Sequence, residues 1–471
     1  MFIDLARRGL LIAYMLLVCF SGKANSFRSF YVNAFSPSFK EDGSMEHPFK
    51  SLNCLKMIEF NPGDCIFLCG NQVFEGNIYV KGIKSESKYP FTISSYGNGI
   101  PQISSRDNSG IIVDSCENIC IKNVLVKGAG RNKGNTGSGI DVSNSRFVKI
   151  DSVEALGYQM NGIGINGGKD ISITNSYAHD NGFNGIAAIG NGYDKRSLAN
   201  VYIGYCVASN NAGTTAIMDN HSGSGILVGY ITNTTIEFCE AMNNGWDMPR
   251  IGNGPVGIWG YEADSLTIQY CFSHHNKTSV GGKDGGGFDF DGGVTNSLMQ
   301  YNLSMYNEGA GYGLFQYAGA TEWKNNIIRY NVSIYDGSKN SNAGFFIWCD
   351  SSLGSNYPLR DSWIYKNVVI SNQGHSIAYE TGFSSGLKIS DNRFILTVKD
   401  NGHIDGDKTK FLPSYEKNYF WSQVAEEKNK IQPVVIMDTA AVYKPMKYAI
   451  PLNVSISRLK DILKNYYLIN E

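Results

Sequence analysis

The chain is poor in charge and in proline. Of its 471 residues, 18% are charged and 12 are proline, and 41 basic against 42 acidic residues leave a formal net charge of −1. No basic excess is available to follow a phosphate backbone, and no P-loop or dinucleotide fingerprint occurs in a strand and helix context. We therefore expect no nucleic acid among the partners of this protein.

Hydrophobic runs long enough to span a bilayer are also missing. The apolar run Gly9–Phe20 falls short of the roughly 20 residues that a transmembrane helix needs. Two arginines precede this run, and Ala24 and Ser26 follow it at the spacing of a signal-peptidase site. The pattern predicts a secretory signal peptide over residues 1–26 and no transmembrane segment.

The mature chain would begin near Phe27 and be secreted, periplasmic or held at the cell surface. Cys19 leaves a lipoprotein as an alternative, although Val18 is a poor residue before a lipidated cysteine. Nine of the ten cysteines lie beyond the signal, so at least one thiol stays unpaired or pairs between chains. CxxC pairs and histidine clusters at zinc spacing are missing, and we expect no structural zinc.

Glycine, in contrast, is abundant, with 53 residues, and this favours a β-rich fold. Seven segments repeat one frame, in which a short run of alternating apolar residues, a pivot and a second short run follow each other. The pivots, 29 to 36 residues apart, are Asn175, Cys206, Cys239, Cys271, Asn302, Asn331 and Asn367. Five residues after each pivot stands an Asx residue: Asp180, Asn211, Asn244, Asn276, Asn307, Asp336 or Asn372.

Between these segments lie others that open on Gly or Ser, such as NGIGING, SGILVGY and GGFDFDG. Each repeat thus supplies three short strands, with Asn at a corner where it tolerates a left-handed backbone. This predicts an all-β fold, a right-handed single-stranded parallel β-helix. An antiparallel sandwich is the alternative, but hairpin signals at a spacing of 8–12 residues are missing.

We expect three parts in the chain. After the signal, residues 27–402 would form the β-helix, whose N-terminal end is capped by a short amphipathic helix near Ser51–Glu59. Residues 403–471 would form a C-terminal strand and helix capping segment, with apolar residues at helical spacing over Ser457–Tyr467. In the repeat, the three cysteine pivots would stack on adjacent rungs. We expect a ladder of buried thiols, although such rungs lie within disulfide range.

The segments FYVNAF, NPGDCIFL and KDGGGFDFDGGVTNSLMQYNLSMYNEGAGYG carry a family resemblance. They resemble the exported bacterial right-handed parallel β-helix proteins of the pectate-lyase-like superfamily, with PbH1-type repeats, over about residues 28–425. The resemblance implies the fold, and it leaves polysaccharide lyase, glycoside hydrolase, epimerase and non-catalytic protein open. The NTD, DD and GHG motifs of polygalacturonases and the DPHD motif of mannuronan epimerases are missing, which weighs against those two activities.

The stretch GGGFDFDGG, Gly285–Gly293, carries two acids in one glycine frame. In each of these strands, we take the first residue after the opening Gly or Ser to point inward. The second and the fourth residues after it then point outward. The first outward column reads Asp141, Gly164, Ala187, Leu227, Trp259, Asp289, Gly313, Phe346 and Ala378. The second column reads Ser143, Asn166, Ile189, Gly229, Tyr261, Asp291, Phe315, Trp348 and Glu380. This register predicts a pair of carboxylates flanked above and below by aromatic side chains, which are platforms for sugar rings.

The longest excursions of the repeat lead into the same strands, so we expect a cleft at this face. The candidate catalytic residues are Asp289, Asp291 and Glu308. The candidate substrate-binding residues are Trp259, Tyr261, Phe315, Phe346, Trp348, Glu380, Arg250, Lys283 and His221. Burial of the aromatic residues by the loops or the C-terminal segment is the alternative to an open platform.

Paired carboxylates fit glycoside hydrolysis, in which one protonated acid serves the leaving oxygen and the other carboxylate acts as nucleophile or base. The prediction is an exported glycoside hydrolase that binds an extended polysaccharide, works as a monomer and needs no metal or other cofactor. A calcium-assisted polysaccharide lyase is the first alternative. Lys283 or Arg250 would then be the base, with Asp284, Asp289 and Asp291 as calcium ligands. A non-catalytic glycan-binding surface protein is the second alternative.

Overall fold

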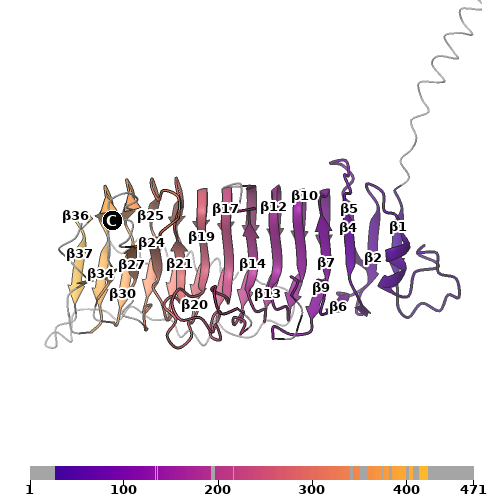
Figure 1. Cartoon of the computed structure of the whole chain (residues 1–471), viewed down its shortest axis with the longest axis horizontal. Helices are drawn as coiled ribbons and strands as arrows, with labels where there is room; N and C mark the ends of the chain where they lie inside the picture. The colour runs from indigo at the N-terminus through magenta and orange to yellow at the C-terminus, as the bar shows by residue number, and fades with distance from the viewer. Residues whose placement is uncertain are drawn as a thin grey trace, which may run out of the picture.

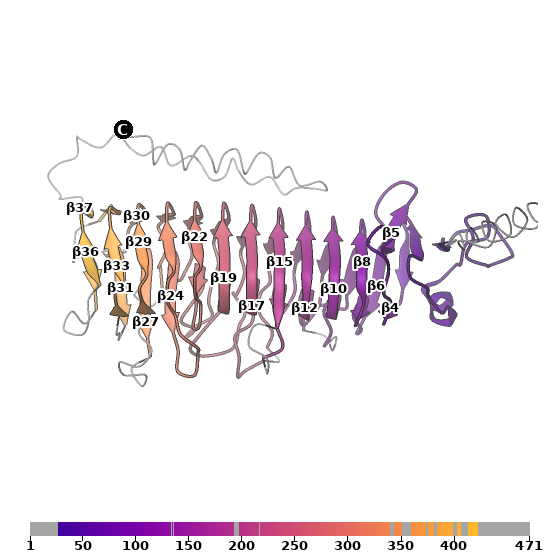
Figure 2. The same ribbon diagram turned by 90° about the horizontal axis from the view of Figure 1, so that it is seen from above.

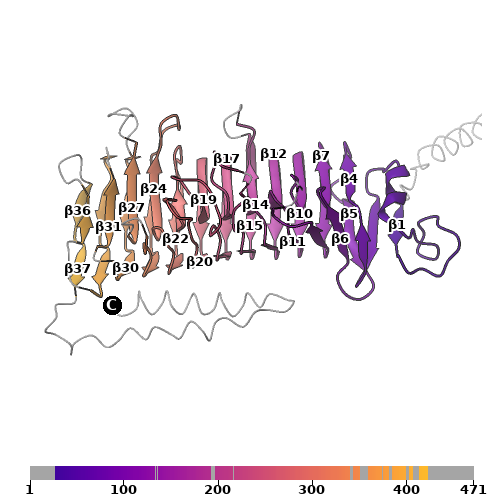
Figure 3. The ribbon, with the colours of Figure 1, turned by 60° about the horizontal axis from the view of Figure 1, so that its bottom comes forward.

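The computed structural model describes residues 27–422, apart from 133, 135, 193–196, 216, 340–342, 351–358, 374, 381–383, 399–402 and 407–412. These residues form a parallel β-helix, as predicted. The strands stack side by side along the long axis, from β1 at the indigo end to β36 and β37 at the yellow end (Figure 1). The turned views show the same single stack (Figure 2 and Figure 3).

Within the described residues, the strands fall into two long parallel sheets and one small pair. Sheet B has 13 strands: β3 (Val73–Glu75), β6 (Gln102–Arg106), β9 (Leu125–Gly128), β11 (Glu154–Leu156), β13 (Tyr177–His179), β16 (Val207–Ser209), β18 (Glu240–Met242), β20 (Phe272–His274), β23 (Leu303–Met305), β26 (Val332–Ile334), β30 (Val368–Ser371), β34 (Arg393–Leu396) and β37 (Tyr419–Ser422). The small pair consists of β28 (Leu359–Arg360) and β32 (Ser384–Ser385).

Sheet A joins the other two strands of each repeat around a corner. It has 22 strands: β1 (Ser29–Val32), β2 (Cys65–Cys69), β4 (Ile78–Lys81), β5 (Phe91–Tyr96), β7 (Ile111–Asp114), β8 (Glu117–Lys122), β10 (Ile140–Asp151), β12 (Asn161–Thr174), β14 (Asn184–Ile189), β15 (Leu198–Gly204), β17 (Ser224–Glu237), β19 (Val256–Gln269), β21 (Gly286–Phe290), β22 (Leu298–Gln300), β24 (Tyr312–Gln316), β25 (Ile327–Arg329), β27 (Phe345–Cys349), β29 (Trp363–Tyr365), β31 (Ile377–Glu380), β33 (Lys388–Ser390), β35 (Ile404–Asp405) and β36 (Ser414–Glu416).

The predicted three strands per repeat are merged in the middle of the solenoid. In β10, β12, β17 and β19 the strand that opens on Gly or Ser continues into the strand before the pivot, to a length of 12 or 14 residues. The chain turns this corner on a residue with positive φ, such as Asn144 or Asn233. Because this corner takes so little chain, the ladder of hydrogen bonds continues around it.

Inward-pointing apolar residues fill the solenoid, because alternate residues of each strand face its axis. Ile226 of β17, Ile258 of β19 and Phe288 of β21 stack one above the other and are fully buried. They belong to one hydrophobic cluster that runs through the described coils. The side chains at intervening positions point outward, and this alternation sets the two faces on which function could reside.

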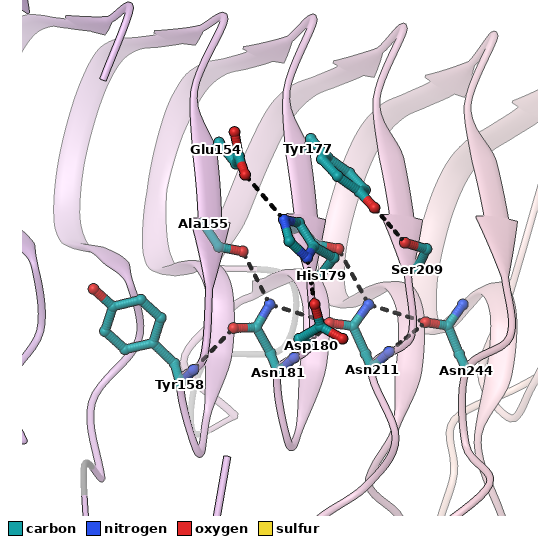
Figure 4. Close-up of polar contacts among 11 residues, drawn as sticks. Glu154, Ala155, Tyr158, Tyr177, His179, Asp180, Asn181, Ser209, Asn211 and Asn244 are labelled. Carbon is teal, nitrogen blue, oxygen red and sulfur yellow. Dashed lines mark hydrogen bonds and ion pairs between the residues drawn. The ribbon is translucent and has the colours of Figure 1, made fainter. Parts of the chain in front are cut away.

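A ladder of buried Asx side chains fastens one corner. The Asn211 and Asn244 backbone N–H groups donate to the amide oxygens of Asn244 and Asn276, and the side-chain amides repeat the same step. The first rung is Asn181, one residue beyond the predicted Asp180 (Figure 4). The last is Asp336, whose carboxylate accepts from Asn307. The predicted Asn372 is exposed.

The pivots form a second buried column. Its first member is Ser176 and not the predicted Asn175, because Tyr177 pairs with Val207 and so places Ser176 level with Cys206. From Asn302 the column continues through the predicted Asn331 and Asn367, then through Asn392 to Asn418, and each amide oxygen accepts the backbone N–H of the rung before.

All nine cysteines in the described residues are free thiols. Those at the pivots, Cys206, Cys239 and Cys271, are buried, and each donates to backbone carbonyl oxygens. Burial raises the pKa of Cys206 and Cys239 well above the usual range. The predicted ladder of buried thiols is confirmed.

The ends agree less well with the predictions. The N-terminal segment contains a six-residue 3₁₀ helix, η1 (Leu52–Met57), with Leu52 and Leu55 buried, and the predicted capping helix is not confirmed. The predicted helix over Ser457–Tyr467 lies outside the described residues, as does the signal peptide. In the part of the chain that is described, no helix combines the length and apolar character that crossing a membrane requires.

Candidate active site

The predicted outward register is confirmed by the strand pairing. Trp259 pairs with Asp289, Asp289 with Gly313, and Gly313 with Phe346. In the second column Phe315 pairs with Trp348, which pairs with Glu380. Side chains from five neighbouring strands, β19, β21, β24, β27 and β31, therefore share one face of sheet A.

Asp289 lies at the centre of this face and is buried, with 3% of its surface exposed. Gly313, on the next rung, leaves room for it: a Cβ atom there would lie 3.1 Å from the Asp289 Oδ1 atom. That oxygen is buried without a hydrogen-bond partner. Burial, reinforced by the negative charges of Asp291 and Asp284, raises the pKa of Asp289 well above its usual range.

Asp291 follows the end of β21 and opens a tight turn. Its backbone N–H donates to Gly260 O at 2.9 Å, which keeps it beside the preceding rung. Its Oδ1 accepts the Gly292 N–H at 2.7 Å. Burial, together with the negative charges of Asp284 and Glu262, raises the pKa of Asp291 to about 7 against the opposing effect of this hydrogen bond.

Glu262 fastens the same turn from below. Its carboxylate accepts the Thr321 N–H and hydroxyl, and it lies against Gly293, whose φ of +76° favours glycine. Gln316 accepts the Gly293 N–H. The backbone that carries Asp291 is thus held by buried polar groups on both neighbouring rungs.

A third acid enters from the loop before β21. Asp284 Oδ2 accepts the Gly254 N–H at 2.6 Å, so it joins this loop to the loop before β19. Burial raises the pKa of Asp284 to about 6. His221, from the loop before β17, stands edge-on to Trp259 with ring centroids 4.9 Å apart. Burial and the nearby Arg250 guanidinium lower the pKa of His221 to about 4, so its imidazole is neutral at pH 7.

The aromatic side chains form walls of unequal exposure. Phe315, Phe346 and Trp348 are half-buried and meet edge to face, with centroids 5.4 and 6.3 Å from that of Phe315. Trp259 is only 4% exposed, because it packs on Leu227 and Val256 and donates its indole N–H to Ser224. The expectation of an open platform is therefore wrong for Trp259, which is a packed wall.

These groups line one pocket on the face. Lys283 and Glu380 form an ion pair of 3.4 Å that links the loop before β21 to the end of β31. The pocket is lined by His221, Asn253, Gly254, Val256, Trp259, Lys283, Asp284, Asp289, Asp291, Phe315, Phe346, Trp348 and Glu380. Among the described residues, no three or more His, Cys, Asp or Glu side chains are grouped as a metal site.

Three predicted site residues do not line the pocket. Glu308 accepts the Thr278 N–H at 2.8 Å and pairs with Lys339 at 2.7 Å, so it holds the loop that carries Asp284. Tyr261 packs beside Trp259 and Tyr230. Arg250 acts on the pocket through its charge, which bears on His221 and Asp284.

Sequence reasoning missed three pocket residues, and it expected a fourth, Asp284, near these strands but gave it a role only as a calcium ligand. The others are Asn253, Gly254 and Val256. All four come from the two excursions that lead into β19 and β21, which leave one edge of the stack in its magenta-to-orange part (Figure 1). The length of these loops was the available signal, but spacing cannot say which loop residue folds back over the strands.

Comparisons with known proteins identify relatives in structure only. No protein-family model and no curated protein matches. Among solved structures, a GH136 lacto-N-biosidase from Eubacterium ramulus matches with a TM-score of 0.51 and 17% identity, over 83% of this chain and 68% of that chain. A mannuronic acid specific polysaccharide family 6 lyase from human gut microbiota matches with a TM-score of 0.53 and 12% identity, over 86% and 90%.

The fold is shared with carbohydrate-active enzymes. Pectate lyase Pel9A also matches, with a TM-score of 0.39 and 14% identity over 82% of this chain and 79% of that chain. The strand pairing of the structure itself confirms the parallel β-solenoid that the resemblance to the pectate-lyase-like superfamily led us to expect. At these identities the likeness is one of fold, and the chemistry has to be argued from the pocket.

Proposed function

We propose that this protein is an exported carbohydrate-active enzyme, a glycoside hydrolase that cleaves a glycan at the Asp289 and Asp291 carboxyl groups. The observation that carries the proposal is the pocket itself. Two acids from one strand end meet beside aromatic walls, and one of them has a buried oxygen without a partner. A structural acid would be expected to have its oxygens hydrogen-bonded.

The two acids differ in ways that suit different roles. Asp289 is more buried and lacks a donor on Oδ1, so its neutral form is favoured and it is the general acid. Asp291 accepts the Gly292 N–H, which stabilises its anion, so it loses its proton first. Environments that separate two titratable groups in this way assign the acid and its partner.

In this mechanism Asp289 gives its proton to the glycosidic oxygen while the bond from that oxygen to the anomeric carbon breaks. Asp291 either attacks the anomeric carbon or takes a proton from the water that does. Phe315, Phe346 and Trp348 offer apolar edges and faces to the sugar ring. Since Asp284, Asp289 and Asp291 converge and Lys283 is paired with Glu380, the pocket favours an uncharged sugar at the point of cleavage.

The test is digestion of a glycan panel by the purified mature protein, by Asp289→Asn and by Asp291→Asn. Reducing ends and the ultraviolet absorbance of unsaturated products are read together. We expect new reducing ends without absorbance, and a loss of about 10³-fold or more in each variant. Circular dichroism checks that both variants are folded.

Glu308→Gln is the matched control, because Glu308 is a nearby carboxylate outside the pocket. Its activity should stay within about tenfold of wild type. Absorbance that disappears with EDTA would instead establish a calcium-assisted lyase, and binding without cleavage would establish a glycan-binding protein. Either result contradicts the hydrolase.

A further inference from the structure

The outer face of sheet B carries a strip of apolar side chains far from the pocket. On three consecutive strands, β23, β26 and β30, the first and third residues are aliphatic or methionine and pair rung by rung. We call this the apolar strip: Leu303, Met305, Val332, Ile334, Val368 and Ile370. It forms a hydrophobic cluster separate from the core of the solenoid.

The strip faces away from the axis of the solenoid. The middle residues of the same strands are the ones that face inward: the Ser304 hydroxyl accepts from Asn307, the Ser333 hydroxyl donates to Asp336, and Val369 belongs to the core. Residues on either side of them must point outward. All six strip residues are nevertheless between 0% and 8% exposed.

Aromatic side chains border the strip on both sides. Tyr301 stacks between Tyr270 and Tyr330, with centroids 5.1 Å apart on each side. Tyr306 and Tyr335 stand at the other border, 5.8 Å apart. Tyr301, Tyr306 and Tyr335 pack against the strip residues. We refer to the apolar strip together with these aromatic borders as the trough.

The trough is local to this part of sheet B. On earlier strands the same outward positions are mixed: Glu154, His179 and Ser209 are polar, Tyr177 carries a hydroxyl group, and Leu156 and Val207 are apolar (Figure 4). His179 binds Glu154 at 3.2 Å, and Tyr177 binds Ser209 at 2.9 Å. From β23 to β30 all six outward positions are apolar and yet 0–8% exposed, so another segment must cover them. Without a cover, an apolar patch of this kind would be costly in water.

We propose that the C-terminal segment of this same chain, residues 423–471, lies in this trough, with Ile456–Ile469 as the part that contacts the apolar strip. The described chain ends at Ser422 in β37, which is the last strand of sheet B. From β37 to β23 is four rungs, or about 19 Å. The 423–455 stretch spans that distance many times over when extended.

The sequence of the segment suits the trough. At helical spacing, Ile456, Leu459, Ile462, Leu463 and Tyr466 fall on one side, and Arg458, Lys460, Asp461 and Lys464 fall on the other. The apolar side of this segment is wide enough to cover the two columns of strip residues on β23, β26 and β30. The polar side would face water, so a single layer of chain completes the surface and no second molecule is needed.

Methionine oxidation in the full mature chain tests this contact. Met305 lies in the trough, Met57 is 87% exposed, and Met299 is fully buried in the core. Under dilute hydrogen peroxide, the wild-type chain should oxidise quickly at the exposed Met45, Met57 and Met218 and slowly at Met305. In the double variant Leu459→Asp with Ile462→Asp, oxidation of Met305 should rise at least about tenfold, toward the rate of Met57.

The matched control is Lys460→Ala with Lys464→Ala, which alters the opposite side of the segment and should leave Met305 protected. Oxidation of Met299 reports whether the solenoid stays folded. The pair Leu459→Ser with Ile462→Ser disturbs folding less and should also raise the oxidation of Met305. Protection of Met305 that persists in both apolar-side variants would overturn the proposal. Protection that falls when the wild-type protein is diluted would also overturn it, because a second copy would then be the cover.

Discussion

At the scale of a single residue, Asp289 shows how the pocket lowers the stability of the fold. Its carboxyl group is buried among aromatic side chains beside two other acids, and one of its oxygens has no partner. Burying a polar group in this way opposes folding. The arrangement keeps a proton on the carboxyl group above the pH at which an exposed aspartate would lose it, which is what an acid catalyst needs.

The pH dependence of stability should reveal this cost. The folded-state pKa values of Asp289 and Asp291 are raised, so their favourable contribution is present below about pH 4 and is lost as pH rises through the folded values. For Asp291 that interval runs from about pH 4 to about pH 7. In Asp289→Asn, the fall in unfolding free energy with pH should lessen by up to about 1.4 kcal/mol per pH unit.

Thermal melts between pH 4 and pH 8 measure this slope. Asp114→Asn is the control, because Lys81 lowers the pKa of Asp114 and its removal should not flatten the curve. If Asp289→Asn is less stable than wild type at pH 8 by the same amount as at pH 4, the carboxyl group is not held protonated in the folded state.

The sequence predicted the column positions of the site residues but not their surroundings. Alternation along GGGFDFDGG places Asp289 outward, and the strand pairing agrees. It could not show that Trp259 is buried, because Ser224 and His221, which touch it, come from a strand and a loop of the preceding repeat. Glu308 could not be placed for the same reason: its partner Lys339 follows 31 residues later.

At the scale of the element, the Asx ladder carries the corner of the solenoid. Asn244 accepts both the backbone N–H and the side-chain amide of Asn211, and donates its own amide to Asn276 and to Ala208 O. Each rung is thus both donor and acceptor to its neighbours. Removing one side chain leaves buried donors on the rung below without partners.

We expect Asn244→Ala to lower the unfolding free energy by about 2–5 kcal/mol, since two buried donors of Asn211 lose their acceptor. Asn166→Ala is the control, because Asn166 is exposed on the outer face of β12, and its effect should stay within about 0.5 kcal/mol. Chemical denaturation of both variants measures the difference. Equal losses in the two would mean that the ladder adds nothing beyond an ordinary exposed asparagine.

The misplacement of the first rung has a physical origin. The sequence HDNG offers both Asp180 and Asn181, and the frame ISITNSYAHDNG fits the repeat at either of two offsets. Pairing of β13 with β16 fixes Asn181 level with Asn211, while Asp180, with φ of 56°, turns outward and binds His179. A one-residue slip of this kind exchanges buried and exposed residues.

At the scale of the whole molecule, the solenoid is a stack in which each coil touches only its neighbours. The period of the pivots was enough to predict this, because three short strands per repeat at a spacing of 29 to 36 residues are typical of a parallel β-helix. The ends could not be predicted equally well. A cap has no repeat to follow, and the sequence near Ser51 supports a 3₁₀ helix as readily as a longer one.

Hydrogen exchange should follow the position of each coil along the stack. The amides of β17 and β19 are covered by coils on both sides, whereas β36 and β37 pair on one side only within the described residues. We expect the central amides to exchange at least about 100-fold more slowly than those of β36 and β37. Mass spectrometry of peptides from the two regions measures this, and a uniform rate along the chain would contradict a stack of independent contacts.

The pocket draws each of its parts from a different rung. The two acids come from β21 and the turn after it, the aromatic wall comes from β24 and β27, and the ion pair closes on β31. Evolution could therefore change the aromatic residues of these strands, one substitution at a time, while the two carboxyl groups that we propose as catalytic stay where they are. Substitutions that change which glycan binds could then arise without altering the groups that would cleave the bond.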